Sequence, residues 1–530
     1  MKFLICFILV SFSAATDLDD YVFAPDDAFE WSYMGAEYDL NGTGIFNRHQ
    51  SWTGYMVNMT SQKWLTDDVF ADESTVKSVW WHILVVIVPS DVIYNHNASI
   101  YITGGKNTHS LPTATDEDIV LTAALAMETK TITSCLFQVP NQPIIFRDDP
   151  LQKSRSEDAV VAYTWDHYLK DTSETTWPLY FPMVKASLRA MDTTTAFIAK
   201  QFPESGYSLD YYTVLGASKR GWTTWLVGAV DSSRVVAICP IVLDLVNYVK
   251  VLHHQYRSYG GWSNTLVDYY ENNITARFDD YNMTLLQAQI DMYTYKDRLV
   301  MPKLVVNAVL DEFQQPDDTR FWWDEMPGPK RFLMTPNADH SELTGILEVI
   351  PAIGTWVTYL LEEKSVPEFT WEISESDGSI TVFLDNVGEV FEASVWYSYS
   401  CGNNIDQETG AVIPRRDFRL ASLDDPCECG ISAQGQCLNL KSFWTRELLE
   451  PEVTQDGSRV YTAHMTAPDD GRYVAYFIDV KYKARDDKLG RSGMPKDLPG
   501  RLEFTSAVSV WPNTFPYEDC EGAGCKGTLL

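Results

Sequence analysis

The stretch Tyr211–Trp225, YYTVLGASKRGWTTW, predicts an apolar strand that turns at Gly216, passes through Ser218 and continues directly as a helix. A serine at such a turn lies at a helix N-terminus, where backbone N–H groups can stabilise an oxyanion, so Ser218 is a candidate nucleophile. It is also a candidate helix N-cap, because serine is a preferred residue at that position. The stretch alone leaves both interpretations open, and the surrounding sequence has to separate them.

Strand-like and helix-like segments alternate around this turn, from Trp80 to Ser341. Several strand candidates are apolar on successive residues, as expected of strands that are covered on both faces. Strands separated by helices indicate a mainly parallel sheet and therefore an α/β domain. The strand candidates are WWHILVVIV, ASIYITGG, TITSCLFQV, YYTVLG, VVAICPIVL and PKLVVNAVL, and the helix candidates include DIVLTAALAMETK and PMVKASLRAMDTTTAFIAKQF.

An acid and a histidine follow the serine in the chain order that a catalytic triad on such a sheet requires. The strand PKLVVNAVL leads to Asp311, and the later run KRFLMTP is followed by NADHS, which carries His340. A serine nucleophile needs a base to take its proton, and the imidazole needs a carboxylate that fixes its tautomer. We therefore predict an α/β-hydrolase fold with a triad of Ser218, His340 and Asp311. Alternatives to Asp311 as the acid are Glu312, Asp317 and Asp339.

The turn departs from the G-x-S-x-G pattern of a nucleophile elbow, because Arg220 stands in place of the second glycine and Gly221 follows it. The variant G-x-S-[RK]-x-G resembles the elbow of some carbohydrate esterases, such as glucuronoyl esterases. That resemblance implies that Lys219 adds charge to its own backbone N–H, which would be one oxyanion donor. We expect the second donor at Gly104 or Gly105 of IYITGGKN, where an ordinary glycine turn is the alternative.

Metal and cofactor sites are not expected. DPCECG lacks the second paired half of a zinc site, and the adjacent histidines His253 and His254 would be splayed apart on a helix. The formal net charge of −32 would repel phosphate backbones and anionic membranes. We therefore predict no metal, no cofactor, and no nucleic-acid or membrane-surface partner.

Length and pattern changes indicate more than one domain. The 530 residues exceed the roughly 250 to 300 at which a single hydrophobic core stops growing. Polar, aromatic-rich helical patterns suggest an insertion at residues 247–300, and short alternating runs after Pro367 predict a β-sandwich. The expected division is a signal peptide at 1–15, a hydrolase domain at 16–366 that contains the insertion, a sandwich at 367–515 and a cysteine-containing tail at 516–530.

The N-terminus MKFLICFILVSFSAAT combines Lys2 with a short apolar run and small residues, which predicts a cleaved secretory signal peptide. No later apolar run approaches the ~18 residues that a membrane span needs, so we expect a secreted protein without membrane insertion. Five N-x-S/T motifs agree with that route and are predicted glycosylation sites. They are Asn41, Asn58, Asn97, Asn273 and Asn282.

Cysteines crowd into the last part of the chain, where an oxidising compartment favours disulfides of undetermined connectivity. Two others, Cys135 and Cys239, lie in apolar runs and are expected to be small buried residues rather than reactive thiols. The cysteines predicted to form disulfides are Cys401, Cys427, Cys429, Cys437, Cys520 and Cys525.

Several stretches of the chain resemble the PhoPQ-activated pathogenicity-related protein family, which includes secreted autocrine proliferation repressor proteins. The resemblance implies an α/β-hydrolase fold and functional positions at Ser218, Asp311 and His340. DEFQQPDDT, residues 311–319, departs from the family where members often carry a phenylalanine pair, whereas the insert DDPCECGISAQGQC resembles the secreted repressor branch. The stretches that carry the resemblance are WWHILVVIVP, IYITGG, RSEDAVVAYTW, PMVKASLRAMD, GASKRGWTTW, PKLVVNAVLDEF, PNADHS and RDFRL.

Two functions of different classes follow from these observations. The first is a secreted serine hydrolase that forms an acyl-enzyme on an ester or peptide bond of a small-molecule or peptide substrate. The second is an extracellular signalling protein that represses proliferation through a cell-surface receptor and uses the hydrolase fold as a scaffold. Loss of the biological effect on replacing Ser218 would tie signalling to chemistry.

Overall fold

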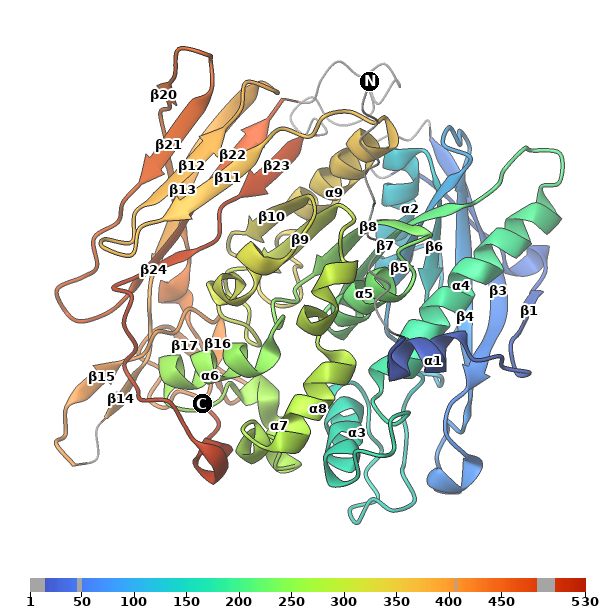
Figure 1. Cartoon of the computed structure of the whole chain (residues 1–530), viewed down its shortest axis with the longest axis horizontal. Coiled ribbons are helices and arrows are strands. Elements are labelled where there is room, and N and C mark those ends of the chain that lie inside the picture. The colour runs from blue at the N-terminus through green and yellow to red at the C-terminus, as the bar shows by residue number, and fades with distance from the viewer. Residues whose placement is uncertain (1–14, 45–49, 406–407, 484–500) are drawn as a thin grey trace, which may run out of the picture.

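The computed structural model describes residues 15–44, 50–405, 408–483 and 501–530, with a large mixed sheet at its centre (Figure 1). The strand order is β1-β3-β4-β6-β5-β7-β8-β9-β10, and β2 pairs with β3. From β6 to β10 neighbouring strands are parallel, whereas β4 is antiparallel to β3 and β6. The bounds are β1 (Glu30–Tyr33), β2 (Leu40–Thr43), β3 (Ser51–Lys63), β4 (Val79–Pro89), β5 (Asn97–Ile102), β6 (Ile132–Leu136), β7 (Tyr211–Ala217), β8 (Val235–Ile241), β9 (Lys303–Ala308) and β10 (Lys330–Thr335).

This topology is the α/β-hydrolase fold, with β5 and β6 exchanged in space and an antiparallel strand before them. The predicted fold class is therefore confirmed. The sheet begins earlier than Trp80, where the sequence analysis placed its start, because β1, β2 and β3 extend it. The strand β3, SWTGYMVNMTSQK, carries polar residues throughout and lacks the continuous apolar run typical of a strand covered on both faces.

Helices cover both faces of the sheet. Alternate residues of one strand point to opposite faces, so Val305 of β9 packs in the core that contains α4 and α5, whereas Leu304 and Val306 pack in the core that contains α9. Helix α2 packs against α9. The helices of this domain are α1 (Asp17–Phe23), α2 (Glu117–Thr129), α3 (Asp158–Lys170), α4 (Tyr180–Gln201), α5 (Lys219–Val230) and α9 (Ile346–Leu361).

The segment between β8 and β9 is helical. It contains α6 (Tyr248–Tyr259), α7 (Val267–Glu271), α8 (Tyr281–Ile290) and short 3-10 turns. The indole N–H of Trp222, on α5, donates to the carbonyl of Ile290 at 2.6 Å, so this insertion lies directly against the helix that follows Ser218.

Two antiparallel sheets follow α9 and pack face to face as a β-sandwich. The first has the order β11-β12-β21-β20, and the second has the order β19-β13-β22-β23 with β24 also paired to β22. Inward residues of both sheets share one apolar core with α9, which joins the sandwich to the hydrolase domain. The bounds are β11 (Phe369–Ile373), β12 (Ile380–Leu384), β13 (Val390–Tyr399), β19 (Thr445–Leu448), β20 (Glu452–Val453), β21 (Arg459–Ala463), β22 (Val474–Tyr482), β23 (Leu502–Thr505) and β24 (Ser509–Trp511).

A cysteine-rich insertion interrupts the second sheet between β13 and β19. It forms a hairpin of β14 (Asn403–Ile405) and β15 (Val412–Pro414) and a small sheet of β16 (Ala421–Ser422), β17 (Ile431–Ala433) and β18 (Gln436–Leu438). Disulfides join Cys401 to Cys429, Cys427 to Cys437 and Cys520 to Cys525. Cys135 and Cys239 are buried and unpaired, as predicted.

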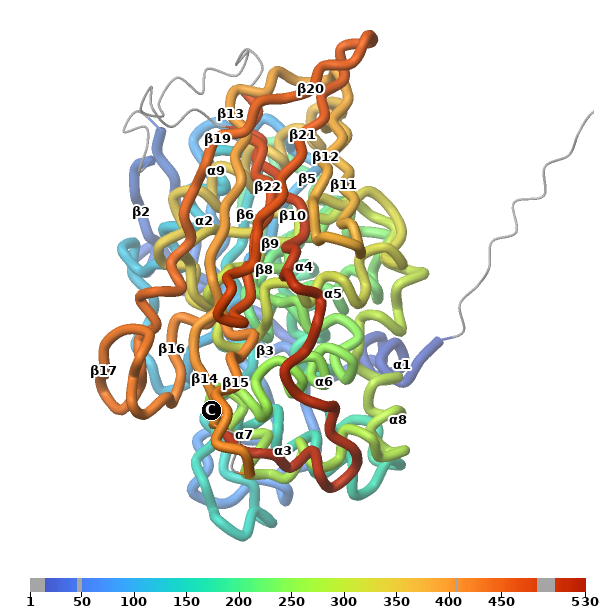
Figure 2. The backbone as a smooth tube through the Cα atoms, turned by 90° about the vertical axis from the view of Figure 1, so that its left-hand side faces the viewer, coloured from blue at the N-terminus to red at the C-terminus, as the bar shows by residue number. Residues whose placement is uncertain are grey.

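The final described segment runs back from the sandwich to the helical insertion. Figure 2 shows it in dark red, reaching the region of α7. The backbone of Trp262 exchanges hydrogen bonds with this segment, donating to Thr528 and accepting from Leu530, both at 2.8 Å. Residues 1–14 of the expected signal peptide lie outside the described chain, and no helix in the described part is long and apolar enough to span a membrane.

Candidate active site

Ser218 lies at a sharp turn between β7 and α5 and has backbone angles of φ 58° and ψ −128°. The turn needs both glycines that flank it. A Cβ atom at Gly216 would lie 2.6 Å from the carbonyl oxygen of Arg220, and one at Gly221 would lie 2.9 Å from that of Ile241. Ser218 occupies the N-cap position of α5, but its side chain makes no capping hydrogen bond, so its hydroxyl is directed elsewhere.

The Ser218 hydroxyl is hydrogen-bonded to His340, and His340 is hydrogen-bonded to Asp311. The distance from His340 Nε2 to Ser218 Oγ is 2.8 Å, and that from His340 Nδ1 to Asp311 Oδ2 is 2.7 Å. A carboxylate at Nδ1 holds the ring proton there, which leaves Nε2 as an acceptor for the serine hydroxyl. The structure thus brings together the three residues that the sequence singled out, each on a turn after a parallel strand.

Asp311 is held by its own loop and its charge acts on His340. Its Oδ1 accepts backbone N–H groups of Phe313 at 2.7 Å and Gln314 at 3.2 Å. Burial alone would lower the pKa of His340, but the Asp311 carboxylate outweighs it, so the pKa lies above its ordinary value. The site therefore favours the protonated imidazole that forms when a base takes a proton from serine.

The other candidate acids have different partners. Asp339 accepts hydrogen bonds from the hydroxyl and the backbone N–H of Ser341. Glu312 accepts the backbone N–H of His340 at 3.3 Å, and burial together with Asp311 and Asp339 raises its pKa to about 7. Of these acids, Asp311 is the one that meets the imidazole ring.

Asp317 anchors the acid loop to the cysteine-rich insertion. It forms two charge-assisted hydrogen bonds with Arg416, at 2.9 and 2.6 Å, and both side chains are almost fully buried. Burial alone would raise the pKa of Asp317, but Arg416 and His254 outweigh it and the pKa lies well below its ordinary value. The backbone N–H of Leu420 also donates to the carbonyl of Leu310, next to Asp311. The RDFRL stretch therefore buttresses the loop that carries the acid.

Glu157 and Asp158 hold the residues that follow the serine, and the sequence analysis did not single them out. Lys219 Nζ lies 2.9 Å from a Glu157 oxygen and 3.0 Å from an Asp158 oxygen, while Arg220 lies 2.7 Å from the other Glu157 oxygen. Burial alone would raise the pKa of Glu157, but Arg220 and Lys219 outweigh it and hold it far below its ordinary value. These ion pairs neutralise both cations beside the turn.

The expected oxyanion donors lie near the turn. Lys219 is the first residue of α5, so its N–H has no acceptor within the helix. Gly104 lies shortly after β5 and packs against Arg220, because a Cβ atom at Gly104 would lie 2.5 Å from the guanidinium group. The next residue, Gly105, has φ 105°. Neither glycine is among the described residues that line the pocket at Ser218, and the oxyanion role of all three stays a prediction.

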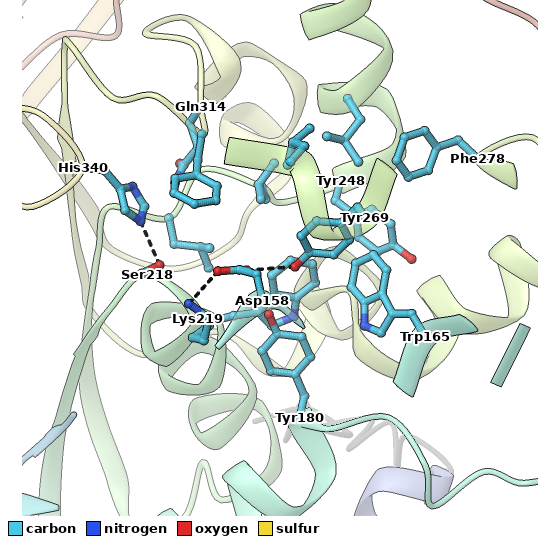
Figure 3. Close-up of a pocket in the computed structure, with 16 residues that line it drawn as sticks. Asp158, Trp165, Tyr180, Ser218, Lys219, Tyr248, Tyr269, Phe278, Gln314 and His340 are labelled. Atoms are coloured by element: carbon cyan, nitrogen blue, oxygen red, sulfur yellow. Dashed lines mark hydrogen bonds and ion pairs between the residues drawn. The ribbon is translucent and has the colours of Figure 1, made fainter. Parts of the chain in front are cut away.

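An aromatic pocket of about 40 Å³ opens beside Ser218 and His340 (Figure 3). That volume suits a few water molecules or a small chemical group. Asp158 lies between Lys219 and Tyr269, whose hydroxyl donates to it at 3.0 Å. The rings come from separate helices and loops, so no single sequence motif predicts the pocket. They include Trp165, Tyr180, Trp222, Tyr248, Tyr269, Phe278 and Phe313.

The predicted glycosylation sites differ in access. Asn41, Asn58 and Asn273 are exposed, whereas Asn97 and Asn282 are half-buried. The side-chain nitrogen of Asn282, to which a glycan would be attached, donates to the carbonyl of Leu169 at 2.9 Å. Glycosylation at all five sites stays a prediction.

The described part of the chain contains two separate clusters of potential metal ligands, and the residues of both clusters make other interactions. Cys520 and Cys525, beside His253, are joined in a disulfide. The carboxylates of Glu348, Asp479 and Glu503 surround the ammonium group of Lys481 at 3.1 to 3.3 Å. The adjacent His253 and His254 bond to different acids, Asp519 and Asp318.

Comparisons with known proteins identify relatives of this chain. A family profile described as PhoPQ-activated pathogenicity-related protein matches residues 18–418. Autocrine proliferation repressor protein A of Dictyostelium discoideum is 32% identical over 544 residues, covering 99% of this chain and 98% of that protein.

Solved esterase structures are also similar, at low identity. Acetyl xylan esterase 1 from Thermoanaerobacterium sp. is 14% identical with a TM-score of 0.40, covering 66% of this chain and 94% of that one. Acetyl xylan esterase from Paenibacillus sp. R4 is 12% identical with a TM-score of 0.39, covering 66% and 91%. At such scores the fold assignment comes from the strand order and not from the likeness.

Proposed function

This chain belongs to the PhoPQ-activated pathogenicity-related protein family, and from that premise we propose that it is a secreted serine hydrolase that cleaves an ester or peptide bond. One observation carries the proposal. A serine at a positive-φ turn at the start of a helix has its hydroxyl 2.8 Å from a histidine that a carboxylate holds at 2.7 Å. That arrangement supports the proposal, because an activated serine needs a base, a carboxylate that fixes the tautomer of the base, and a charge that stabilises its protonated form.

The first half of the reaction forms an acyl-enzyme. Ser218 Oγ attacks the carbonyl carbon of the substrate while His340 Nε2 takes the hydroxyl proton, and Asp311 stabilises the resulting imidazolium. The carbonyl oxygen becomes an oxyanion, which the N–H of Lys219 and an N–H near Gly104 would hold. Collapse of this intermediate expels the alcohol or amine, which receives the proton from His340.

The second half of the reaction reverses these roles with water. His340 Nε2 takes a proton from a water molecule, whose oxygen attacks the acyl carbon. The second oxyanion collapses, Ser218 recovers its proton from His340, and the carboxylic acid is released. A small-molecule or peptide substrate satisfies this chemistry, and it requires neither a metal nor a cofactor.

The proposal is tested by labelling the protein with a fluorophosphonate, which reacts with activated serines. Wild type should be labelled, and Ser218→Ala and His340→Ala should not. Ser341→Ala is the matched control, because Ser341 is next to His340 but its hydroxyl bonds to Asp339. Absence of label on folded wild type across pH 5 to 9, or label that persists in Ser218→Ala, would overturn the proposal.

A signalling role is the second candidate, and the name of the Dictyostelium relative, autocrine proliferation repressor protein A, favours it. In this form the secreted chain would repress proliferation through a cell-surface receptor, with the hydrolase fold as scaffold. The measurement is the proliferation of responsive cells exposed to purified wild type or Ser218→Ala. An equal effect of both proteins would separate signalling from hydrolysis, and loss of the effect in the folded variant would make signalling depend on the serine.

A further inference from the structure

A second cavity, of about 250 Å³, lies between α2 and α9 on the face of the sheet away from α5. It borders the backbone next to the proposed catalytic residues. Ala217 lines it and directly precedes Ser218, and Ser341 lines it and directly follows His340. The serine turn therefore has the small aromatic pocket on one side and this larger cavity on the other.

The walls of the second cavity are aliphatic. Leu121 and Leu125 contribute from α2, Ile346, Ile350 and Ile353 contribute from α9, and Leu215 contributes from β7. Leu121, Ile346 and Ile350 are only half-buried, so part of their apolar surface is uncovered. A cavity of about 150 Å³ with such a lining holds benzene. This one has room for a longer hydrocarbon group, which the aromatic pocket at about 40 Å³ does not.

The charged groups of the cavity disfavour an anionic ligand. Glu117, Asp118 and Glu342 line it, and the described lining includes no Lys, Arg or His. Burial raises the pKa of Glu342 well above its ordinary value, which favours the protonated, neutral form of this carboxyl group. A ligand that presents a carboxylate would meet acids without a compensating cation, whereas a neutral ester or amide would not.

Exposed leucines continue the apolar surface outside the cavity. Leu343 is 64% exposed and Leu347 is 58% exposed, on the segment that supplies Glu342 and Ile346 to the lining. Large exposed apolar side chains beside an apolar cavity are typical of a surface that receives an apolar ligand.

We propose that this cavity holds the aliphatic acyl chain of a neutral ester or amide, while the aromatic pocket takes a small leaving group. The inference rests on the proposed hydrolase function and specifies its substrate. Ser218 Oγ would bond to the acyl carbon, the bond to the alcohol or amine would break, and His340 would return the proton to that leaving group. Water then releases the aliphatic acid, whose carboxylate finds no compensating cation in the described lining of the cavity.

The test compares kcat/KM, measured by acid release, for methyl acetate, methyl butyrate and methyl octanoate, whose methanol leaving group suits the aromatic pocket of about 40 Å³. Wild type should prefer octanoate over acetate by at least tenfold. Leu121→Trp and Ile350→Trp fill the cavity, and each should lower kcat/KM for octanoate at least tenfold more than it lowers kcat/KM for acetate. Val453→Trp, which adds the same side chain at an exposed position in the sandwich, should change neither.

Two further measurements separate the ways in which this proposal could fail. A small alkyl fluorophosphonate reports the activated serine in every variant, and thermal unfolding reports the fold. Wild type that takes the label but shows no chain-length preference, or filled variants that lose acetate and octanoate equally, would overturn the inference and leave the proposed function intact. Wild type without label would instead overturn the proposed function.

Binding to Ser218→Ala tests the cavity without turnover. A ligand that binds the folded state raises the unfolding temperature by an amount that grows with the ratio of its free concentration to its Kd. Octanoate ester should stabilise Ser218→Ala more than acetate ester does, and Ile350→Trp in the same background should remove the difference. Equal stabilisation by both esters would overturn the inference.

Discussion

Two helices of the hydrolase domain begin with the same unusual backbone conformation. Ser218, before α5, has φ 58° and ψ −128°, and Glu157, before α3, has φ 56° and ψ −128°. Such a conformation costs a residue other than glycine about 1–3 kcal/mol, so the surrounding structure has to hold both turns in place. The side chains differ in what they meet, an imidazole for Ser218 and two cations for Glu157.

The comparison teaches that strained backbone does not by itself identify a nucleophile. The same turn presents a hydroxyl to a base in one place and a carboxylate to Lys219 and Arg220 in the other. The second turn also serves the first, because those two cations directly follow Ser218. The Glu157 turn therefore anchors the Ser218 turn. Substitutions at the two turns should differ in how they affect activity and stability.

The largest effect should come from Asp311→Asn. The amide cannot hold a proton at His340 Nδ1 as the carboxylate does, so the imidazole is left in the wrong tautomer. We expect kcat/KM on an activated ester to fall about 10⁴-fold, with little change in the circular dichroism of the fold. A loss below about tenfold would show that Ser218 does not depend on this acid. It would also indicate that the Ser218 turn, like the Glu157 turn, has a structural role and does not present a nucleophile.

Glu157→Gln should have the next largest effect, and it should act on both stability and activity. The amide leaves Lys219 and Arg220 with weaker partners beside Ser218, so kcat/KM should fall about 10- to 100-fold through misplacement of the turn. The unfolding free energy should fall by about 1–2 kcal/mol, a figure reduced because the Glu157 side chain is 38% exposed. Asp72→Asn, which breaks an exposed ion pair with Arg147, is the control and should leave the unfolding free energy unchanged within the error of the measurement.

Acid titration gives a second measurement on the same variant. Because its pKa in the fold lies below the ordinary value of 4.5, ionised Glu157 stabilises the protein above that pH and loses this effect as the pH falls further. Urea unfolding of wild type should therefore show a loss of stability below pH 4.5 that is smaller in Glu157→Gln. Parallel stability curves for the two proteins would contradict the ion-pair role of Glu157.

Glu312→Gln should have a moderate effect on pH dependence. The Glu312 carboxylate adds to the charge that raises the pKa of His340, so its removal should move the acid limb of kcat/KM to lower pH, by less than about one unit. Its raised pKa of about 7 means that the folded state binds the proton more tightly than the unfolded chain, so this group makes stability fall as pH rises from 4.5 to 7. The variant should lack that fall. An unchanged acid limb would exclude Glu312 from the charge environment of the base.

The smallest effect isolates the strain at the serine turn. Glycine accepts positive φ without cost, so Ser218→Gly should be more stable than Ser218→Ala by about 1 kcal/mol in urea unfolding. Ser187, inside α4, is the matched control, because there glycine should be less stable than alanine by about the same amount. The same order of stability at both positions would show that the Ser218 turn is not strained.

The sequence predicted the residues of the triad because each follows a parallel strand, and parallel strands bring such turns to one edge of a sheet. It did not predict β3, whose mixed polar pattern resembles neither a covered strand nor a clean alternation. Glu157 and Asp158 were also missed, since an ion pair across the fold leaves no periodic signal in either segment. Most rings of the aromatic pocket were missed for the same reason, as they converge from several elements. Disulfide pairing required the fold, because spacing alone allows several connectivities.

The pairing of Asp317 with Arg416 has a consequence for the timing of maturation. During synthesis Ser218, Asp311 and His340 all leave the ribosome before Arg416 and Leu420, which brace the loop of the acid. The growing chain thus holds every reactive group of the proposed triad before it holds the support that aligns them. Hydrolytic competence should then appear only once the cysteine-rich insertion has emerged and folded, so an incomplete chain in transit would carry a dormant serine.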